Sequence, residues 1–482
     1  MSVPRMLPLT ALRPRQLLPA LCIVLTVCLL FFFFQRESEY TVVASVVNDS
    51  NAINSTNADK GTPPAIETTE PVLTEPVLTE PALTEPAPMK PKYKPQPTWI
   101  PPPVKDPFPL LSLTNPPPVP SWNQPKNPNI YHVYGLPVAP PLLIGFTRSW
   151  PMLLQTVVGY ITAGWPAEQI FVVENTGVHD ANARGRLSLQ NPFYLNYTQL
   201  EMLNVTIVRT PVLLSFAQLQ NYFVSVAKEK LWPYYFWSHM DSFVLSYEEG
   251  MEGISGPVGT PEYQTIYDLA IKELNYTIHS NQKWGARFFA YDHFTLVNPS
   301  AYDEVGGFDT FIPYYMTDCD MHWRLEEAGW SIKEAKAGIV EDVAPKSTAA
   351  ECPPEETEKR SVRQLSTGGT TTSADNKASD SAKETMTVAE ALKSFKKLYQ
   401  ISHDMLLHKQ GDRGRNTWQL GQRGGDPREP YYYDALGFQV GIDVMTEAGR
   451  EAFRRKWGHQ GCDFGAAGLK PGDAWKVEKD WE

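Results

Sequence analysis

Short apolar runs alternate with amphipathic segments between residues 141 and 241, and this alternation determines the predicted fold. Positions 151–164 and 215–230 repeat their apolar residues at the spacing of a helix. Apolar runs of strand length precede, separate and follow them, at residues 141–147, 169–174, 204–209 and 233–241. Strands that alternate with helices of this length predict an α/β fold with a mainly parallel sheet, covered by helices on both faces.

The C-terminal part of the chain continues this mixture. A helix is expected from Asp318 to Ala328, and further helical patterns occur at 388–408 and 447–457. Residues 352–385 are rich in Ser, Thr, Glu and Lys and contain almost no large apolar side chain, which predicts a disordered surface insertion. We therefore expect one domain over residues 129–482 that carries this insertion.

The N-terminus contains a continuous apolar run instead of a periodic one. Residues 17–34 carry no charge and follow Arg5, Arg13 and Arg15. At about 1.5 Å per residue the run covers roughly 27 Å, which is enough for a thin secretory-pathway bilayer. The basic residues predict that positions 1–16 stay cytosolic and that the rest of the chain lies in the lumen of the Golgi or ER. A cleaved signal peptide is the alternative, but four consecutive Phe residues and no Ala-x-Ala site argue against cleavage.

Proline content separates this anchor from the domain. Of the 43 prolines, 21 lie between Pro63 and Pro128, and residues 69–88 repeat a five-residue unit as TEPVL, TEPVL, TEPAL and TEPAP. Such density favours polyproline II, so residues 35–128 are predicted to form a semi-rigid lumenal stalk; a linker of no specific role is the alternative. Sequons for N-glycosylation agree with a lumenal chain and occur at Asn48, Asn54, Asn196, Asn204 and Asn275.

Charge and cysteine content exclude several classes of protein. The net charge of −11 argues against a nucleic-acid partner, which needs a basic surface. The 42% hydrophobic and 12% aromatic content is sufficient for a sizeable core. Outside the apolar run, Cys319, Cys352 and Cys462 allow at most one disulfide and one free thiol, and the sequence leaves the pairing open.

Two carboxylate clusters are candidates for chemistry. His239 and Asp241 end an apolar strand and point to the same side, so they could bind a divalent cation; a strand-end cap is the alternative. Asp318 and Asp320 lie in the first turn of the predicted helix, where the helix dipole stabilises acids whether or not they have a catalytic role.

In this order the clusters resemble inverting glycosyltransferases of the GT-A fold, near glycosyltransferase family 2 and its relatives in fungal Golgi membranes. The resemblance covers about residues 141–343. It is carried by VVENTG at 172–177, Gln220-Asn221, His239-Met-Asp241 at the family's Asp-x-Asp position, and the segment 307–329. The chain departs from the family at His239, which replaces the first Asp, and at Thr317, where Glu is common.

The resemblance implies transfer of a sugar, with inversion, from a nucleotide sugar to a glycan, glycoprotein or glycolipid acceptor. Asp318 would be the general base, and Asp241 with His239 would bind Mn²⁺ or Mg²⁺ against the leaving diphosphate. Glu174 and Asn221 would contact the donor. On the acceptor side the implied residues are Asp320, Tyr314, Tyr315 and Trp330. The three aromatic side chains could stack on sugar rings, and ordinary core or rim packing is the alternative. Asp320 is expected to pair within the protein because it points away from Asp318.

Two other functions compete with this interpretation. A catalytically inactive, membrane-anchored glycan-binding or scaffold protein would explain why His239 replaces an acid. A hydrolase would require Asp241 and Asp318 to flank one glycosidic bond.

Overall fold

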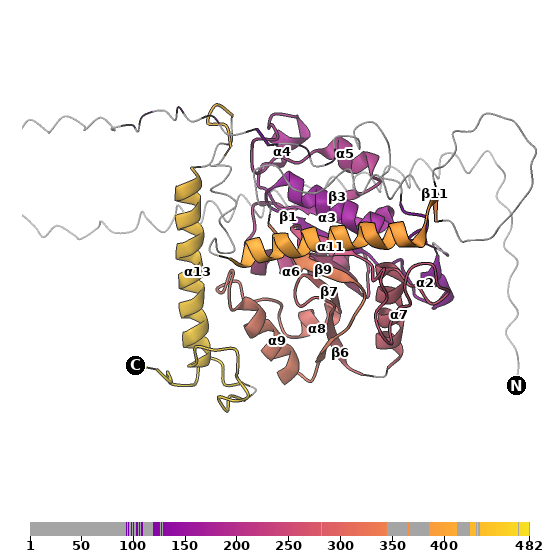
Figure 1. Cartoon of the computed structure of the whole chain (residues 1–482). Helices are drawn as coiled ribbons and strands as arrows, with labels where there is room; N and C mark the ends of the chain where they lie inside the picture. Colours follow the sequence, from indigo (N-terminus) through magenta and orange to yellow (C-terminus); the bar gives the residue numbers. More distant parts are fainter. Residues whose placement is uncertain are drawn as a thin grey trace, which may run out of the picture. The chain divides into compact units, whose positions relative to one another are not determined.

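The computed structural model divides the chain into two units, Met1–Lys92 and Tyr93–Glu482, and every described residue belongs to the second (Figure 1). The structure describes residues 129–344 except 281, residues 364–365 and 385–411, residues 425–481 except 430, 432, 433 and 471, and separate positions between 93 and 127. The expected anchor at 17–34, the pentapeptide repeats and most of the insertion at 352–385 lie outside this set. No helix among the described residues combines the length and apolarity that a bilayer crossing requires.

A seven-stranded sheet with the order β3-β2-β1-β4-β7-β6-β8 organises this unit. All neighbours pair in parallel except β7, which runs antiparallel to β4 and β6. The strands are β1 (Leu142–Phe146), β2 (Ile170–Glu174), β3 (Thr206–Arg209), β4 (Tyr235–Ser238), β6 (Trp284–Phe288), β7 (Phe294–Val297) and β8 (Ser331–Glu334). The predicted α/β fold with a mainly parallel sheet is confirmed.

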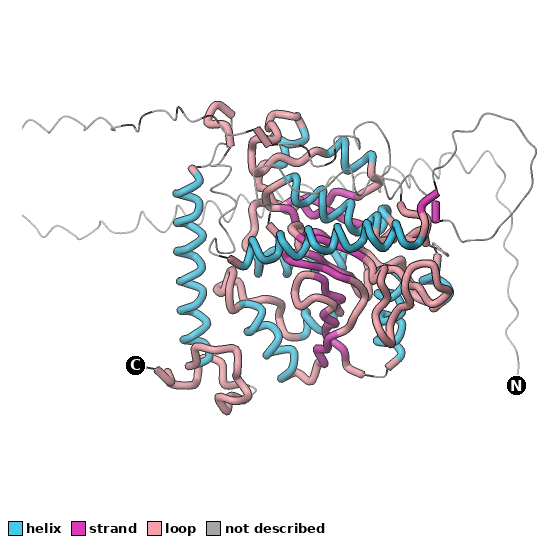
Figure 2. Tube along the Cα trace, viewed as in Figure 1, coloured by secondary structure: helices cyan, strands magenta, loops and turns pink. Residues whose placement is uncertain are grey.

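Helices cover both faces of the sheet, which explains why its central strands, such as β1 and β2, are mostly apolar (Figure 2). Leu142 and Ile144 of β1 belong to one buried cluster, whereas Leu143, between them, belongs to another. Side chains of α3 (Trp150–Thr162) and α7 (Ile266–His279) fill the first cluster. The second contains side chains of α6 (Phe216–Glu229), α8 (Pro299–Glu304) and α9 (Thr317–Glu327).

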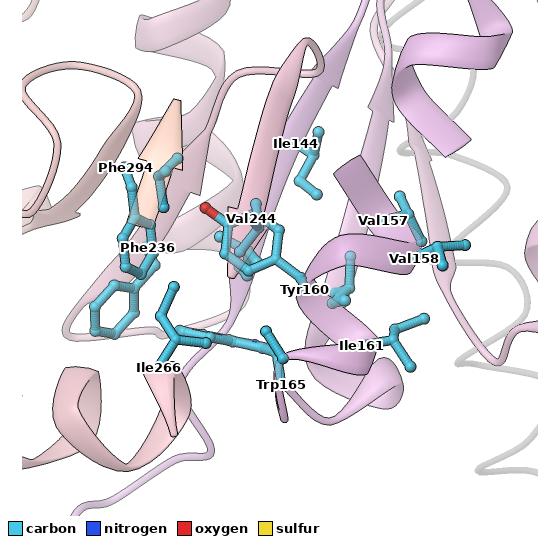
Figure 3. Close-up of a cluster of buried hydrophobic side chains, with 14 of the residues drawn as sticks. Ile144, Val157, Val158, Tyr160, Ile161, Trp165, Phe236, Val244, Ile266 and Phe294 are labelled. Carbon is cyan, nitrogen blue, oxygen red and sulfur yellow. The ribbon is translucent and has the colours of Figure 1, made fainter. Parts of the chain in front are cut away.

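Several aromatic side chains pack together among the aliphatic residues of the first cluster (Figure 3). The Trp165 ring lies 5.2 Å from Phe236 and 5.8 Å from Phe294, and Tyr160 lies 5.6 Å from Phe294, each measured between ring centroids. These rings pack α3 and the turn after it against β4 and β7. The loops that follow these strands therefore begin at well-packed positions.

Two two-stranded sheets and two long helices complete the described part of this unit. Strand β5 (Ser242–Leu245) pairs antiparallel with β9 (Ile339–Asp342), and β10 (Gln364–Leu365) pairs with β11 (Thr385–Met386). Helix α11 (Val388–Gln410) agrees with its prediction, whereas α13 (Ala435–Trp457) begins earlier than the expected residue 447. Gly437 and Gly441 weaken the helical pattern before residue 447. The short helical elements are α2 (Ile130–Val133), η2 (Ala167–Gln169), α4 (His179–Ala183) and α5 (Tyr197–Met202).

The folded unit begins before the predicted boundary at residue 129. Phe108 is 2% exposed and packs in the same cluster as α3, while Trp122 and Asn123 are also buried. The prediction is too late because it used proline density alone, and scattered apolar residues among prolines can still pack onto a core.

Candidate active site

A cleft with a volume of about 330 Å³ opens beyond the carboxyl ends of β1, β2 and β4. Thr147 and Arg148 follow β1, Asn175 follows β2, and His239 and Asp241 follow β4; all of them line the cleft. In α/β sheets this edge is where ligands bind, because the carboxyl ends of the parallel strands meet there.

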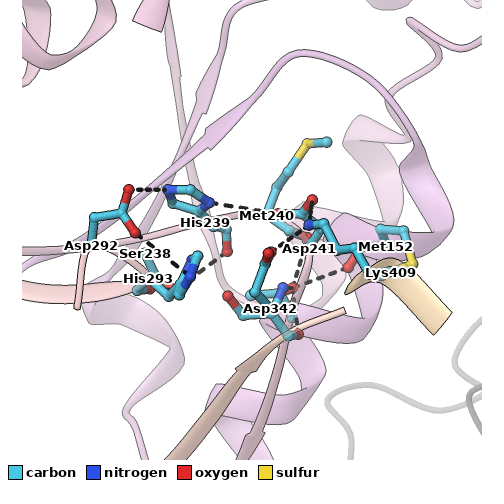
Figure 4. Close-up of polar contacts among 11 residues, drawn as sticks. Met152, Ser238, His239, Met240, Asp241, Asp292, His293, Asp342 and Lys409 are labelled. Atoms are coloured by element: carbon cyan, nitrogen blue, oxygen red, sulfur yellow. Dashed lines mark hydrogen bonds and ion pairs between the residues drawn. The ribbon is translucent and has the colours of Figure 1, made fainter. Parts of the chain in front are cut away.

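The charged centre of the cleft contains Asp241, Asp342 and Lys409 (Figure 4). The Lys409 Nζ lies 2.7 Å from Asp241 Oδ2 and donates a second hydrogen bond to Asp342. Burial alone would raise the pKa of Asp241, but the charges of Lys409 and His239 lower it to about 2. Asp241 is therefore a carboxylate at neutral pH, paired with an ammonium group that is only 7% exposed.

Segments far apart in the sequence bring these three side chains together. Strands β5 and β9 place Ser242 opposite Asp342, and the Val343 N–H donates to the Asp241 carbonyl at 2.9 Å. The Thr156 hydroxyl of α3 lies 2.7 Å from the Met240 carbonyl, which fixes the turn before Asp241. Lys409 comes from the last turn of α11.

Two histidines and another acid adjoin this centre. His239 Nε2 lies 3.8 Å from Asp292 Oδ2, and His293 Nε2 lies 3.6 Å from Asp292 Oδ1. Burial, followed by the charge of His239, lowers the pKa of His293, so its imidazole is neutral at pH 7. Two donor sets have ligand atoms within 4.8 Å of one another and could bind a metal: His239 with Asp241 and Asp342, and His239 with Asp292 and His293.

Asp318 lies on the same cleft at the N-terminus of α9. The Tyr291 hydroxyl donates a hydrogen bond of 2.6 Å to Asp318 Oδ2. Both Tyr291 and Met316, which precedes α9, have left-handed backbones, with φ of 49° and 76°. Such conformations are costly for residues other than glycine and concentrate at functional sites.

Arg148 and two tyrosines line the cleft as well. Burial lowers the pKa of Arg148 to about 9, opposed by the charge of Asp241. The guanidinium is therefore still charged at pH 7. Tyr314 and Tyr315 are half-buried, and Tyr315 lies beneath the Arg450 guanidinium at 5.3 Å from its ring centroid. The cleft thus has apolar faces beside fixed cations.

Glu174 does not line this cleft. It is fully buried, and its carboxylate accepts hydrogen bonds from Thr176, Asn182 and Tyr197. The next residue, Asn175, lines the cleft and binds both the Leu214 N–H and the Leu214 carbonyl, at 2.7 and 2.9 Å. The donor contact predicted for Glu174 disagrees with this arrangement. Successive side chains along a strand point to opposite faces, and at this position Asn175, not Glu174, points into the cleft.

Asn221 also lies outside the cleft lining. Its amide binds the backbone of Phe308, donating to the carbonyl at 2.9 Å and accepting from the N–H at 2.7 Å. A Cβ on Gly307, where φ is +70°, would lie 2.5 Å from Asn221 Oδ1. Asn221 therefore fixes the loop before α9, and Gln220 beside it lines the cleft.

Two of the acceptor-side candidates are structural. Asp320 is fully buried, and its carboxylate binds Arg324 at 2.8 Å, Lys456 at 2.6 Å and the Trp457 indole N–H at 3.0 Å. Trp330 lies outside the cleft lining, with the Lys283 ammonium 4.3 Å from its ring centroid. The internal pairing predicted for Asp320 agrees with this arrangement, and the stacking role predicted for Trp330 does not.

Sequence reasoning missed several residues of the cleft. Asp342 ends a short apolar strand, the same signal that identified Asp241. Lys409 and three residues of α13 give no comparable signal in the sequence, because they approach the cleft from helices far along the chain. The missed residues are Arg148, Asn175, Asp292, His293, Asp342 and Lys409, together with Phe438, Ile442 and Thr446 of α13.

Comparisons with known proteins give only distant likenesses. No protein-family model matches this chain, and neither does any curated protein. A mannosyltransferase from Pyrobaculum calidifontis, solved with GDP-Man and Mn²⁺, is 11% identical with a TM-score of 0.28 over 44% of this chain and 61% of that chain. GalNAc-T7, solved with UDP, GalNAc and Mn²⁺, is 12% identical with a TM-score of 0.28 over 47% of each chain. A cytidylyltransferase from Leptospira borgpetersenii is 8% identical with a TM-score of 0.26 over 41% of this chain and 75% of that chain.

The chain spans less than two thirds of the mannosyltransferase and of GalNAc-T7. At TM-scores of 0.26 to 0.28, these likenesses support no conclusion about the fold or the function of this chain.

Proposed function

We propose that this domain is a GT-A glycosyltransferase that transfers a sugar from a nucleotide sugar to a glycan, glycoprotein or glycolipid, with inversion. One observation carries the proposal: a single cleft at the carboxyl edge of the sheet contains both fixed cations and Asp318. The parallel strands β3-β2-β1-β4 followed by antiparallel β7, and the resemblance over residues 141–343, support it.

The cation side of the cleft suits a diphosphate. Arg148 and Lys409 line it, and so does the first residue of α6, a helix whose N-terminus carries the positive end of the helix dipole. Phe216 and Trp237 form part of the apolar wall, against which a nucleotide base can pack. We assign the donor to this side.

Asp318 is the proposed general base. It takes the proton of an acceptor hydroxyl as that oxygen attacks the anomeric carbon from the face opposite the diphosphate. The bond from the anomeric carbon to the diphosphate breaks in the same displacement, so the configuration inverts. Because Tyr291 donates to Oδ2, this hydrogen bond orients the carboxylate and leaves Oδ1 toward the acceptor.

The expected divalent cation does not fit between Asp241 and Asp342 as the cleft stands. His239, Asp241 and Asp342 are suitable donors, but the Lys409 ammonium already contacts both carboxylates. No step of the proposed reaction is therefore assigned to a metal ion.

Binding and turnover of nucleotide sugars test the proposal. A panel of nucleotide sugars, screened by thermal shift on the wild type, is expected to include one that raises the melting temperature. With that donor, Asp318→Asn should lower transfer about 10² to 10⁴-fold, because removing a general base costs this much. Asp303→Asn, at an exposed acid paired with Lys228, is the matched control and should leave transfer unchanged. Full turnover by Asp318→Asn would exclude its role, and donor binding without any turnover would favour the inactive glycan-binding alternative.

We also propose a type II membrane orientation in the Golgi or ER, with residues 35–482 in the lumen. The Arg5, Arg13 and Arg15 cluster before the apolar run supports it. The disulfide between Cys319 and Cys462 suits an oxidising lumen. Protease added to sealed microsomes should spare the domain, and digestion without detergent would contradict this topology.

A further inference from the structure

The ion pair between Lys409 and the two strand-end acids lies where a metal centre was expected. We infer that the Lys409 ammonium is the resident cation between Asp241 and Asp342 and occupies the place that a divalent ion would otherwise take. The role of the Lys409 ammonium in sugar transfer rests on the proposed function. Its occupancy of the site does not, and can be measured without any nucleotide sugar.

The space between Asp241 and Asp342 has room for one cation. The donor atoms of His239, Asp241 and Asp342 lie within 4.8 Å of one another, and Lys409 Nζ contacts both carboxylates, at 2.7 Å from Asp241. An ion such as Mn²⁺ or Mg²⁺ would contact the same oxygens at about 2.0 to 2.2 Å. It would therefore fill the space that the ammonium group occupies.

Displacing Lys409 is also unfavourable. Its side chain is 7% exposed, so a metal ion between the acids would leave the ammonium buried beside a like charge. The helix that carries it is anchored nearby, because the Ser402 hydroxyl donates to Glu341 of β9. Asp241 and Asp342 together raise the pKa of Lys409 against the effect of burial, so the group stays charged.

This arrangement gives the ammonium a defined role. Two of its three N–H groups bind Asp241 and Asp342, and the third can donate to a phosphate oxygen of the donor. Together with Arg148, Lys409 balances the two carboxylates, so a diphosphate entering this side meets no net negative charge from them. The expected metal dependence is replaced by an internal lysine.

Mn²⁺ binding to the full chain, followed by electron paramagnetic resonance without nucleotide, tests the occupancy. Lys409→Met removes the charge but keeps much of the side-chain volume, so it should bind Mn²⁺ at least about tenfold more tightly than the wild type. The gained site should be lost again in the double variant Lys409→Met/Asp342→Asn. Lys396→Met, on an exposed position of the same helix, is the matched control and should behave as the wild type.

Two results would overturn the inference. One is a folded Lys409→Met protein with no gained Mn²⁺ site. The other needs no lysine variant and remains informative if Lys409→Met does not fold: a saturable Mn²⁺ site in the wild type that Asp342→Asn removes.

Sugar transfer gives a second readout once a donor is known. Wild-type turnover should be unchanged by a chelator, whereas Lys409→Met should lose turnover and regain part of it with Mn²⁺. Loss of wild-type turnover in chelator would contradict the role of Lys409. Failure to find any donor would reject the proposed function and leave the Mn²⁺ measurements valid.

Discussion

Asp318 and Asp320 are close in sequence but lie in different environments. Asp318 faces the cleft, whereas Asp320, on the same helix, is fully buried and binds Arg324, Lys456 and Trp457. Residues two positions apart on a helix diverge by about 200°, so only one can point into the cleft. The sequence predicts this division, but it cannot show that Lys456, which is 136 positions further along the chain, completes the buried pair.

Asp320→Asn is expected to destabilise the fold. The substitution leaves Arg324 and Lys456 without their shared buried anion, a change that costs about 3 kcal/mol or more. Urea unfolding of the two single variants measures it, with Asp318→Asn as the control that should unfold close to the wild-type midpoint. An Asp320→Asn protein as stable as the wild type would show that this network contributes little.

His322 should make stability depend on pH. It lies on α9 beside Phe288, with 5.0 Å between ring centroids, and burial lowers its pKa to about 4 although Asp318 opposes the shift. In the unfolded chain the same histidine binds a proton below about pH 6.5. The unfolded state therefore binds more protons in this window, and stability should fall as the pH drops from about 6.5 to about 4.

Chemical denaturation at pH 7 and pH 4.5 tests this dependence. His322→Gln should reduce the difference between the two pH values, because it removes the titrating group. His279→Gln, at an exposed position, should keep the wild-type difference. An unchanged difference in His322→Gln would assign the pH dependence to other groups.

At the level of elements, strands β1 to β4 and helices α3, α6 and α9 agree with their predictions. They could be predicted because burial on both faces gives apolar runs, and amphipathic helices repeat at a fixed spacing. Pairings between distant elements could not be predicted. The register of β5 with β9, the approach of α11 and the start of α13 depend on packing that no local pattern encodes.

The disulfide between Cys319 and Cys462 links α9 to the segment after α13. Around it, the Trp323 and Phe464 rings stack with centroids 5.1 Å apart, and Phe453 and Trp457 are buried in the same cluster. The sequence leaves three possible pairings among three cysteines, and only the packing of this cluster selects one.

Loss of this disulfide should lower the free energy of unfolding by about 2 to 5 kcal/mol. Cys462→Ser is the variant, and thermal unfolding with and without reductant is the measurement. Reductant should lower the melting temperature of the wild type but not of Cys462→Ser. Cys352→Ser, which leaves the described disulfide intact, is the control and should respond as the wild type; a melting temperature equal to that of Cys462→Ser would show that Cys352 takes part in the pairing.

For the whole molecule, the N-terminal limit of the folded unit has a measurable consequence. Phe108 is 2% exposed in the main core, and Asn123 accepts a 2.5 Å hydrogen bond from Tyr263 and donates one of 2.9 Å to the Thr162 carbonyl. A chain that begins at Tyr93 keeps these contacts, whereas a chain that begins at Asn129 loses all of them.

The shorter chain should therefore be the less stable one. Removing a buried phenylalanine alone costs about 3 to 5 kcal/mol, and the lost contacts of Trp122 and Asn123 add to this. Thermal unfolding of the two chains measures the difference, and Phe108→Ala in the chain from Tyr93 should lie between them. Equal melting temperatures for both chains would show that residues 93–128 contribute nothing to stability, and would restore the boundary that proline density predicts at residue 129.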